Sequence, residues 1–160
     1  MHVFRGLPHP LLRRPSAIAI GNFDGVHLGH QALLEYVKAS ALERGLVPSV
    51  VTFEPHPKDF FGRGGEVARI STLYDKVLHL LQAGIERIYI LPFNAKLARM
   101  KAEDFVSQIL IEGLGACWIS VGEDFRFGGD RAGNVDLLRT LSKTLPFEVY
   151  VAPTFFHKDA

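Results

Sequence analysis

The pattern of apolar and polar positions predicts strands that alternate with helices along the whole chain. Five short apolar runs have the length and composition of strands buried on both faces. They lie at 17–20, 48–53, 87–91, 116–121 and 147–151. Between them, apolar residues recur at helical spacing in four segments, at 28–44, 73–83, 102–114 and 134–142. This alternation predicts right-handed crossovers and a doubly wound, mostly parallel sheet, whose ligands bind beyond the carboxyl ends of the strands.

One helix start carries a local signal of its own. Thr72 is followed three residues later by Asp75, a spacing that resembles a capping box. We therefore expect the second helix to begin just after Thr72.

Composition places the chain among ordinary globular domains. Its 160 residues are 48% hydrophobic and 22% charged, which suits one domain with one core. A net charge of +1 gives no overall field that would recruit nucleic acid or an anionic membrane. No apolar run approaches the roughly 20 residues needed to span a bilayer, and the first residues lack a signal-peptide core. A cytoplasmic protein is the expectation.

The segment Gly21–His30 carries the strongest chemical signal, because it lies between the first predicted strand and the first predicted helix. Two histidines three residues apart at a helix start, His27 and His30, point the same way. Free backbone N–H groups there favour a polyphosphate, and Gly29 allows its close approach. The spacing matches neither the phosphate-binding loop of kinases nor the dinucleotide fingerprint. Two imidazoles without a third nearby ligand also make a poor zinc site, so no protein-bound metal is expected.

These residues resemble a known family. Gly21–His30 looks like the H-x-G-H nucleotidyltransferase motif in the longer form found in bacterial FAD synthases. Three further stretches resemble the same family, namely Phe53–Pro57, Thr72–Lys76 and Val121–Gly128. The chain is therefore identified as similar to the N-terminal FMN adenylyltransferase domain of bifunctional riboflavin kinase/FAD synthases. The resemblance implies a Rossmann-like, doubly wound, mostly parallel five-stranded sheet of the H-x-G-H nucleotidyltransferase type.

The resemblance also implies a reaction and a set of site residues. AMP would pass from ATP, bound with Mg2+, to FMN, giving FAD and pyrophosphate, with His27 and His30 as the catalytic residues. The implied ATP-binding residues are Gly21, Asn22, Phe23, Asp24, Gly25, His27, Gly29 and His30. The implied FMN-binding residues are His56, Phe60, Asp124, Phe125, Arg126, Phe127 and Arg131. Phe125 or Phe127 would stack on the isoalloxazine ring, and Arg126 or Arg131 would pair with the FMN phosphate.

Several of these residues have an equally plausible structural role. Phe125 and Phe127 have the period-two spacing of core residues in an extended segment. His56, held between two prolines, fits a rigid turn as well as a pocket wall. Phe60 fits packing against the sheet as well as a cover for a flavin.

The resemblance stops short of the family pattern at the carboxyl end. The family carries an Ile-Ser-Ser-Thr-x-Ile-Arg motif soon after the last strand, and then a riboflavin kinase domain. Residues 1–160 contain neither, so the expected unit is an FMN adenylyltransferase domain truncated at its C-terminus. Two alternatives stay open. One is an incomplete, non-catalytic flavin- or nucleotide-binding fragment. The other is a different H-x-G-H adenylyl- or cytidylyltransferase.

Overall fold

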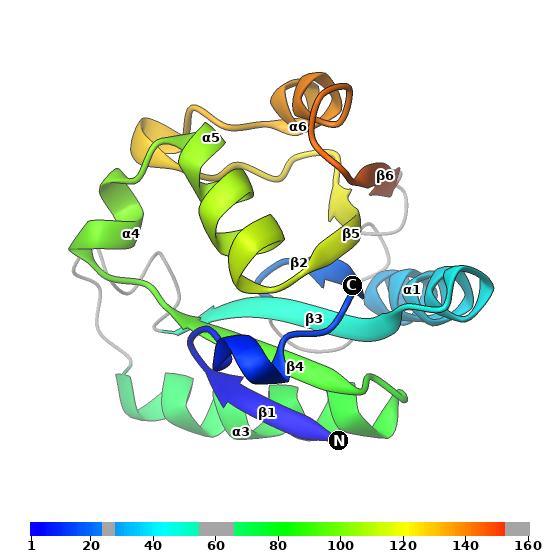
Figure 1. Cartoon of the computed structure of the whole chain (residues 1–160). Coiled ribbons are helices and arrows are strands. Elements are labelled where there is room, and N and C mark those ends of the chain that lie inside the picture. The colour runs from blue at the N-terminus through cyan, green and yellow to red at the C-terminus, as the bar shows by residue number, and fades with distance from the viewer. Residues whose placement is uncertain (24–27, 55–65, 153–160) are drawn as a thin grey trace.

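A six-stranded parallel sheet forms the centre of the protein (Figure 1). The computed structural model describes residues 1–23, 28–54 and 66–152, and of residues 28–30, 66–72 and 130 it describes the backbone only. The strand order is β1-β4-β3-β2-β5-β6, and every pairing is parallel. The strands are β1 (His2–Arg5), β2 (Ser16–Ile20), β3 (Val47–Glu54), β4 (Arg87–Pro92), β5 (Ala116–Gly122) and β6 (Glu148–Ala152).

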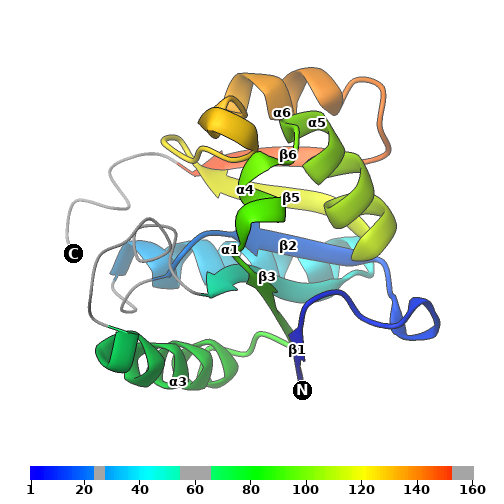
Figure 2. The same cartoon turned by 90° about the vertical axis from the view of Figure 1, so that its left-hand side faces the viewer.

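Helices cover both faces of this sheet, as the views in Figures 1 and 2 show. One face packs against α1 (Leu28–Arg44) and α3 (Glu66–Gln82). The other face packs against α5 (Ala102–Asp104), its π-helical continuation η2 (Phe105–Gly113), and α6 (Val135–Leu141). Alternate residues of the central strands serve the two layers, so that Ile18 packs with η2 while Ala17 and Ala19 pack with α1. This arrangement confirms the expected Rossmann-like doubly wound fold.

The change in strand order falls between β2 and β5. From β2 the chain builds outward through β3 to β4, and it then returns to place β5 on the other side of β2. Because all strands are parallel, the segments that follow β2 and β5 leave the sheet side by side at its carboxyl edge. Ligands of doubly wound sheets bind at this point.

The structure has one strand more than the sequence pattern predicted. β1 lies at the edge beside β4, in register from the His2–Arg87 pair onward. Its residues are mostly exposed, so it lacks the apolar run that marks a buried strand. Its backbone pairing with β4 is supported by a stack of the Phe4 ring on Tyr89 at 5.2 Å between centroids.

Two helix predictions also change. α3 begins at Glu66, so Thr72 lies inside the helix and the predicted capping box with Asp75 is wrong. A short helix not predicted, α4 (Ala95–Arg99), follows β4 and is capped by Asn94, whose Oδ1 accepts a hydrogen bond from Leu97 N at 2.9 Å. Two single-turn helices, η1 (Pro10–Leu12) and η3 (Gly129–Arg131), complete the described elements. No helix in this part of the chain is long and apolar enough to cross a membrane.

Candidate functional site

The segment that leaves β2 is held tightly to the sheet. Gly21 N donates to Val51 O at 3.1 Å, which extends the β2–β3 ladder by one residue. Phe23 then adopts a left-handed backbone conformation, with φ of 52°, and its ring is only 3% exposed in the core under α1. A Cβ atom at Gly21 would lie 3.2 Å from Phe23 Cε2, so the glycine makes room for this ring. Phe23 therefore anchors the turn with its side chain, and only its backbone faces the site.

A buried lysine from α3 also reaches this turn. Lys76 Nζ donates to the backbone oxygen of Asn22 at 2.7 Å and to Thr52 Oγ1 at 3.0 Å. Thr52 Oγ1 in turn donates to the same Asn22 oxygen at 3.2 Å. The turn after β2, the end of β3 and the middle of α3 are thus joined at one carbonyl group.

The side chain of Asn22 leaves one acceptor open. Its Oδ1 atom is buried and has no hydrogen-bond partner among the described residues. A buried acceptor without a donor costs about 1–3 kcal/mol, so this position favours a donor from a ligand or a water molecule. Asn22 is one of the residues that the sequence assigned to ATP.

Several residues predicted for the ATP site, the two histidines among them, lie wholly or partly outside the described residues. Asp24, Gly25 and His27 lie outside the described residues. Gly29 and His30 lie in the first turn of α1, whose backbone is described and whose side chains here are not. The amino end of this 17-residue helix, whose first N–H groups have no partner within the helix itself, is therefore at the carboxyl edge of the sheet. His56 and Phe60 also fall outside the described residues.

The segment after β5 carries the other predicted residues. Asp124, Arg126 and Arg131 are exposed, and Phe125 is half-buried. Phe127 is only 7% exposed and belongs to the core. The Phe125 and Phe127 rings stack at 5.6 Å between centroids, with 18° between their planes. The two phenylalanines thus differ: Phe127 is a core residue, and Phe125 is a half-buried ring packed against that core.

Phe127 belongs to a row of aromatic rings along the carboxyl edge. Phe105 lies 5.8 Å from Phe127 and 6.4 Å from Phe53, measured between ring centroids. Phe93 meets Phe53 edge-on at 6.1 Å. The row therefore runs from the residue after β4, past the end of β3, to the segment after β5.

Two hollows open near this edge. A polar cavity of about 390 Å3 lies at the ends of β5 and β6, beside the start of α6. Its lining is mainly charged and polar, formed by Glu123, Asp124, Arg126, Asn134, Val135, Asp136, Arg139 and Val151. Within the described ranges no three His, Cys, Asp or Glu side chains cluster closely enough to hold a metal ion.

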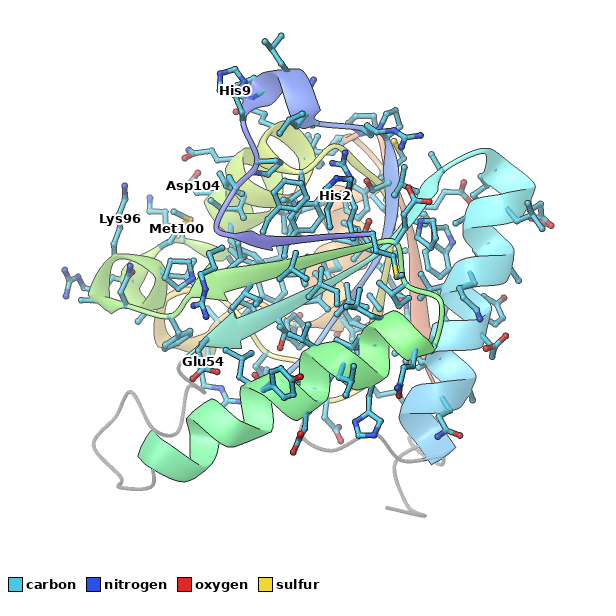
Figure 3. The ribbon with its side chains drawn as sticks, turned by 90° about the horizontal axis from the view of Figure 1, so that it is seen from below. His2, His9, Glu54, Lys96, Met100 and Asp104 are labelled. Carbon is cyan, nitrogen blue, oxygen red and sulfur yellow. The ribbon has the colours of Figure 1, made fainter. Side chains whose placement is uncertain are left out.

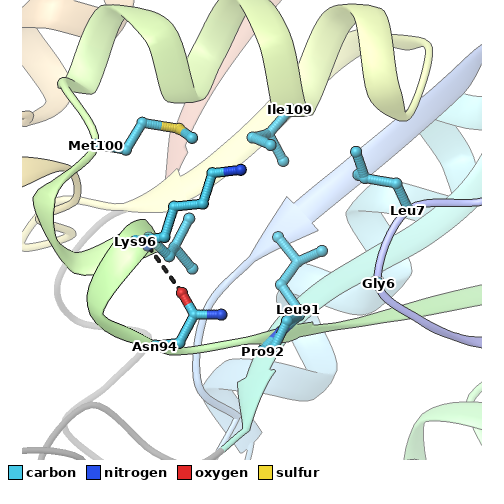
Figure 4. Close-up of a pocket in the computed structure, with 9 residues that line it drawn as sticks. Gly6, Leu7, Leu91, Pro92, Asn94, Lys96, Met100 and Ile109 are labelled. Atoms are coloured by element: carbon cyan, nitrogen blue, oxygen red, sulfur yellow. Dashed lines mark hydrogen bonds between the residues drawn. The ribbon is translucent and has the colours of Figure 1, made fainter.

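The second hollow is an apolar pocket of about 180 Å3 between β4, α4 and η2 (Figure 4). Leu91, Leu97, Met100 and Ile109 form much of its wall, and the Lys96 side chain extends along it. Viewed from below the sheet, Glu54 at the end of β3 lies on the same side of the molecule as Lys96 and Met100 (Figure 3).

The sequence as a whole matches one protein family. The model of the family described as FAD synthetase matches residues 10–160. This chain belongs to the FAD synthetase family.

The similar proteins compared below all have the same name. The chain is 39% identical over 155 residues to a bifunctional riboflavin kinase/FMN adenylyltransferase of Pseudomonas fluorescens, covering 96% of this chain and 50% of that protein. It is 34% identical over 158 residues to the protein of that name in Escherichia coli K12, covering 97% and 50%. The Haemophilus influenzae protein is 36% identical over 150 residues, covering 93% and 49%. The chain therefore spans about half the length of these relatives.

A solved structure shares the fold. The chain superposes on a crystal structure titled as a macrolide-efflux protein from Streptococcus pneumoniae with a TM-score of 0.73 and 23% sequence identity. The match covers 96% of this chain and 51% of that one. At this level of identity the likeness supports the Rossmann-like architecture alone.

One residue of this FAD synthetase domain was not singled out from the sequence. Lys76 stood inside a stretch that resembled the family, and the stretch was interpreted as a helix start. Its spacing from Leu73 and Leu80 puts it on the apolar face of α3, where it is 4% exposed. A lysine at an apolar helical position is the signal that could have found it, because charged side chains are almost never fully buried without a partner.

Proposed function

We propose that this domain transfers the AMP group of ATP to FMN, giving FAD and pyrophosphate. Membership of the FAD synthetase family over residues 10–160 carries the proposal. It is supported by the fold, which brings the segments after β2 and β5 to the same edge of the sheet. The relatives are named for two activities, and we assign the adenylyltransferase activity to the half that this chain spans.

ATP would bind at the turn after β2 and the amino end of α1. The free N–H groups of the first helical turn attract phosphate, and the backbone of residues 21–23 is already fixed by Val51 and Lys76. The open Oδ1 acceptor of Asn22 would take a hydrogen bond from the nucleotide or from a water molecule bound with it. Within this group we propose Gly21, Asn22, Gly25, Gly29 and the backbone of Phe23 and Asp24 as ATP contacts. His27 and His30 would stabilise the negative charge that develops on the transferred phosphate.

FMN would bind along the segment after β5. Phe125 offers a half-buried ring next to the aromatic row, and the guanidinium groups of Arg126 and Arg131 are exposed for its phosphate. Asp124 would accept a hydrogen bond at the rim. His56 and Phe60 remain proposed flavin contacts. For Phe127 the burial of the ring leaves a supporting role behind Phe125 in place of the direct contact expected from the sequence.

The reaction needs alignment more than activation. An oxygen of the FMN phosphate attacks the α-phosphorus of ATP, the new P–O bond forms, and the bond to the bridging oxygen of the β-phosphate breaks. Pyrophosphate leaves with that oxygen, and no proton has to be removed from the anionic nucleophile. The protein must hold two anions in line and offset their repulsion, which the helix start and the arginines suit.

Mg2+ would be held mostly by the substrate phosphates, because this ion keeps few protein ligands in such sites. The exposed carboxylate of Asp124 is an oxygen ligand of the right kind at the rim. When bound, the ion would neutralise phosphate charge. A cytoplasmic location remains a prediction.

The proposal is tested by incubating the chain with FMN, ATP and Mg2+ and separating the flavins by chromatography. We expect FAD to form, and we expect the double variant His27→Ala, His30→Ala to lose at least about 100-fold in rate. Lys38→Met, far from the carboxyl edge, is the control and should keep the wild-type rate. Binding of FMN and ATP without FAD formation would instead favour the non-catalytic binding module.

A further inference from the structure

We propose that Lys76 is a positioning residue for the nucleotide: from α3 it fixes the turn after β2 in the geometry that binds ATP. The inference rests on the proposed function, because it assigns a role within that same site. Lys76 acts through the backbone of Asn22, and we do not place it in contact with the reacting atoms.

Hydrogen bonds from Lys76 and from Thr52 meet at one carbonyl group. The Asn22 oxygen accepts from Lys76 Nζ at 2.7 Å and from Thr52 Oγ1 at 3.2 Å, while Lys76 Nζ also donates to Thr52 Oγ1 at 3.0 Å. This closed triangle fixes the orientation of the peptide group that follows Asn22. Because that peptide leads directly into Phe23, its orientation fixes the direction in which the backbone leaves Asn22.

Burial makes this arrangement costly to form and hard to move. Lys76 is 4% exposed and Thr52 is fully buried. Removing a lysine ammonium from water costs free energy unless hydrogen bonds compensate it, so a lysine is a costly choice for mere packing at a position flanked by Leu73 and Leu80. The hydrogen bonds gained are of the charge-assisted kind, shorter and stronger than those between neutral groups.

The rest of the turn shows what remains for Lys76 to do. Gly21 is already bonded to Val51 O, and the Phe23 ring is already anchored in the core. Between these two fixed points the Asn22 peptide would be free to rotate without a donor to its oxygen. Lys76, which belongs to α3 and not to the turn, prevents this rotation. Preorganised groups bind more tightly because they lose less freedom on binding.

The chain offers a matched control for this lysine. Lys38 Nζ, on α1, also donates to a backbone oxygen at 2.7 Å, that of Ala83. Ala83 follows α3 and precedes β4, which places this bond at the opposite end of the sheet. Lys38→Met therefore removes a lysine–carbonyl bond of the same length, together with the ion pair that this 30% exposed lysine forms with Glu35 at 2.9 Å, without touching the proposed site.

The experiment compares wild type, Lys76→Met and Lys38→Met by calorimetric titration with ATP and with FMN, by thermal unfolding, and by the KM for ATP in FAD formation. For Lys76→Met we expect ATP affinity to fall about tenfold or more, as loss of a charge-assisted hydrogen bond predicts, with FMN affinity kept within about twofold. For Lys38→Met we expect a lower midpoint of thermal unfolding and unchanged ATP affinity. Lys76→Arg, which keeps the charge and the donors, should recover part of the lost affinity.

Two binding results and one kinetic result would overturn the inference. One is a Lys76→Met variant that loses thermal stability as Lys38→Met does and binds ATP like wild type. The other applies if Lys76→Met does not fold. Thr52→Val, which removes only the hydroxyl of the triangle, should then weaken ATP binding roughly threefold. Unchanged ATP binding by Thr52→Val would refute the role of the triangle. If wild type itself neither binds ATP nor forms FAD, the proposed function fails together with this inference. If wild type forms FAD and the Lys76 and Thr52 variants have an unchanged KM for ATP, the inference alone is refuted.

Discussion

Single side chains set local properties that can be measured one at a time, and the ring stack at the β6 edge is an example. Tyr150 lies 4.2 Å from Tyr36 and 6.0 Å from Trp118 between ring centroids, with interplanar angles of 11° and 13°. Burial raises the pKa of the Tyr150 hydroxyl above its usual range, and the nearby Tyr36 raises this pKa further. The folded state thus holds the Tyr150 proton more tightly than the unfolded chain does.

This shift predicts a loss of stability in alkali. Above about pH 10 the unfolded chain ionises Tyr150 while the folded protein keeps it neutral, so the free energy of unfolding falls as pH rises through that window. Below it, the shift contributes nothing to the pH dependence. Tyr150→Phe keeps the ring and removes the hydroxyl. Between pH 9 and pH 11 its free energy of unfolding should therefore fall less than that of the wild type, because the ionisation of Tyr150 on unfolding is lost. Equal alkaline slopes for both proteins in denaturant titrations would contradict this assignment.

The two phenylalanines after β5 predict opposite phenotypes. Phe125→Ala removes a half-buried ring at the rim, so we expect KM for FMN to rise about tenfold with little loss of stability. Phe127→Ala removes a core ring between Phe105 and Phe125, so we expect the free energy of unfolding to fall by about 3–5 kcal/mol. Steady-state kinetics and denaturant unfolding separate the two effects. A stable Phe127→Ala protein with an impaired KM would return the direct flavin contact to Phe127.

Among the elements, the connection between β5 and α6 is fixed by close backbone contacts. Gly128 has a φ of 81°, and its N-terminal neighbour Phe127 exchanges two backbone hydrogen bonds with Gly133 at 2.8 and 3.1 Å. A Cβ atom at Gly128 would lie 2.7 Å from Ala102 Cα at the start of α5. The segment that carries the predicted FMN residues can therefore approach α5 this closely only because Gly128 has no side chain.

Gly128→Ala should be strongly destabilising. With φ of 81° and ψ of 179°, Gly128 has a backbone conformation that is essentially restricted to glycine and costs an alanine about 1–3 kcal/mol, and the contact with Ala102 adds a further 1–3 kcal/mol or so. Gly45→Ala is the control, because Gly45 has a φ of 69° and no atom within 4 Å of the added Cβ. We expect its cost to be about 1 kcal/mol in denaturant unfolding. Similar costs at the two positions would show that the close approach to α5 does not constrain the segment.

Elements also differ in how visible they are in the sequence. The five strands predicted from apolar runs are present: β2, β3, β4 and β5 are mostly buried, and β6 is half-buried at the sheet edge. β1 was missed since its pairing with β4 is made by backbone hydrogen bonds and one aromatic stack, without an apolar run. The start of α3 at Glu66 was missed because the turn chemistry at Thr72 suggested a cap, although Val67 and Ile70 continue the helical apolar spacing of the later residues toward the amino end.

For the whole molecule, the fold class followed from the sequence, and the predicted topology brings the segments after β2 and β5 together at the edge where we propose the site. The difference between Phe125 and Phe127 did not follow from the sequence, since period-two spacing cannot tell a core ring from a rim ring. The role of Lys76 depends on a contact across 54 positions of sequence, from α3 to Asn22. Local patterns contain no information about such a contact. Whether His27 and His30 converge stays a prediction from the motif.

The central claim is that this domain transfers AMP from ATP to FMN, and isotope tracing tests it most directly. The chain is incubated with FMN, Mg2+ and ATP labelled with 32P at either the α- or the γ-phosphate. We predict that the α-label appears in FAD, that the γ-label appears in pyrophosphate, and that riboflavin in place of FMN takes up neither label. Transfer of the γ-label to a flavin, or recovery of both labels in unreacted ATP while FMN remains unchanged, would contradict the account.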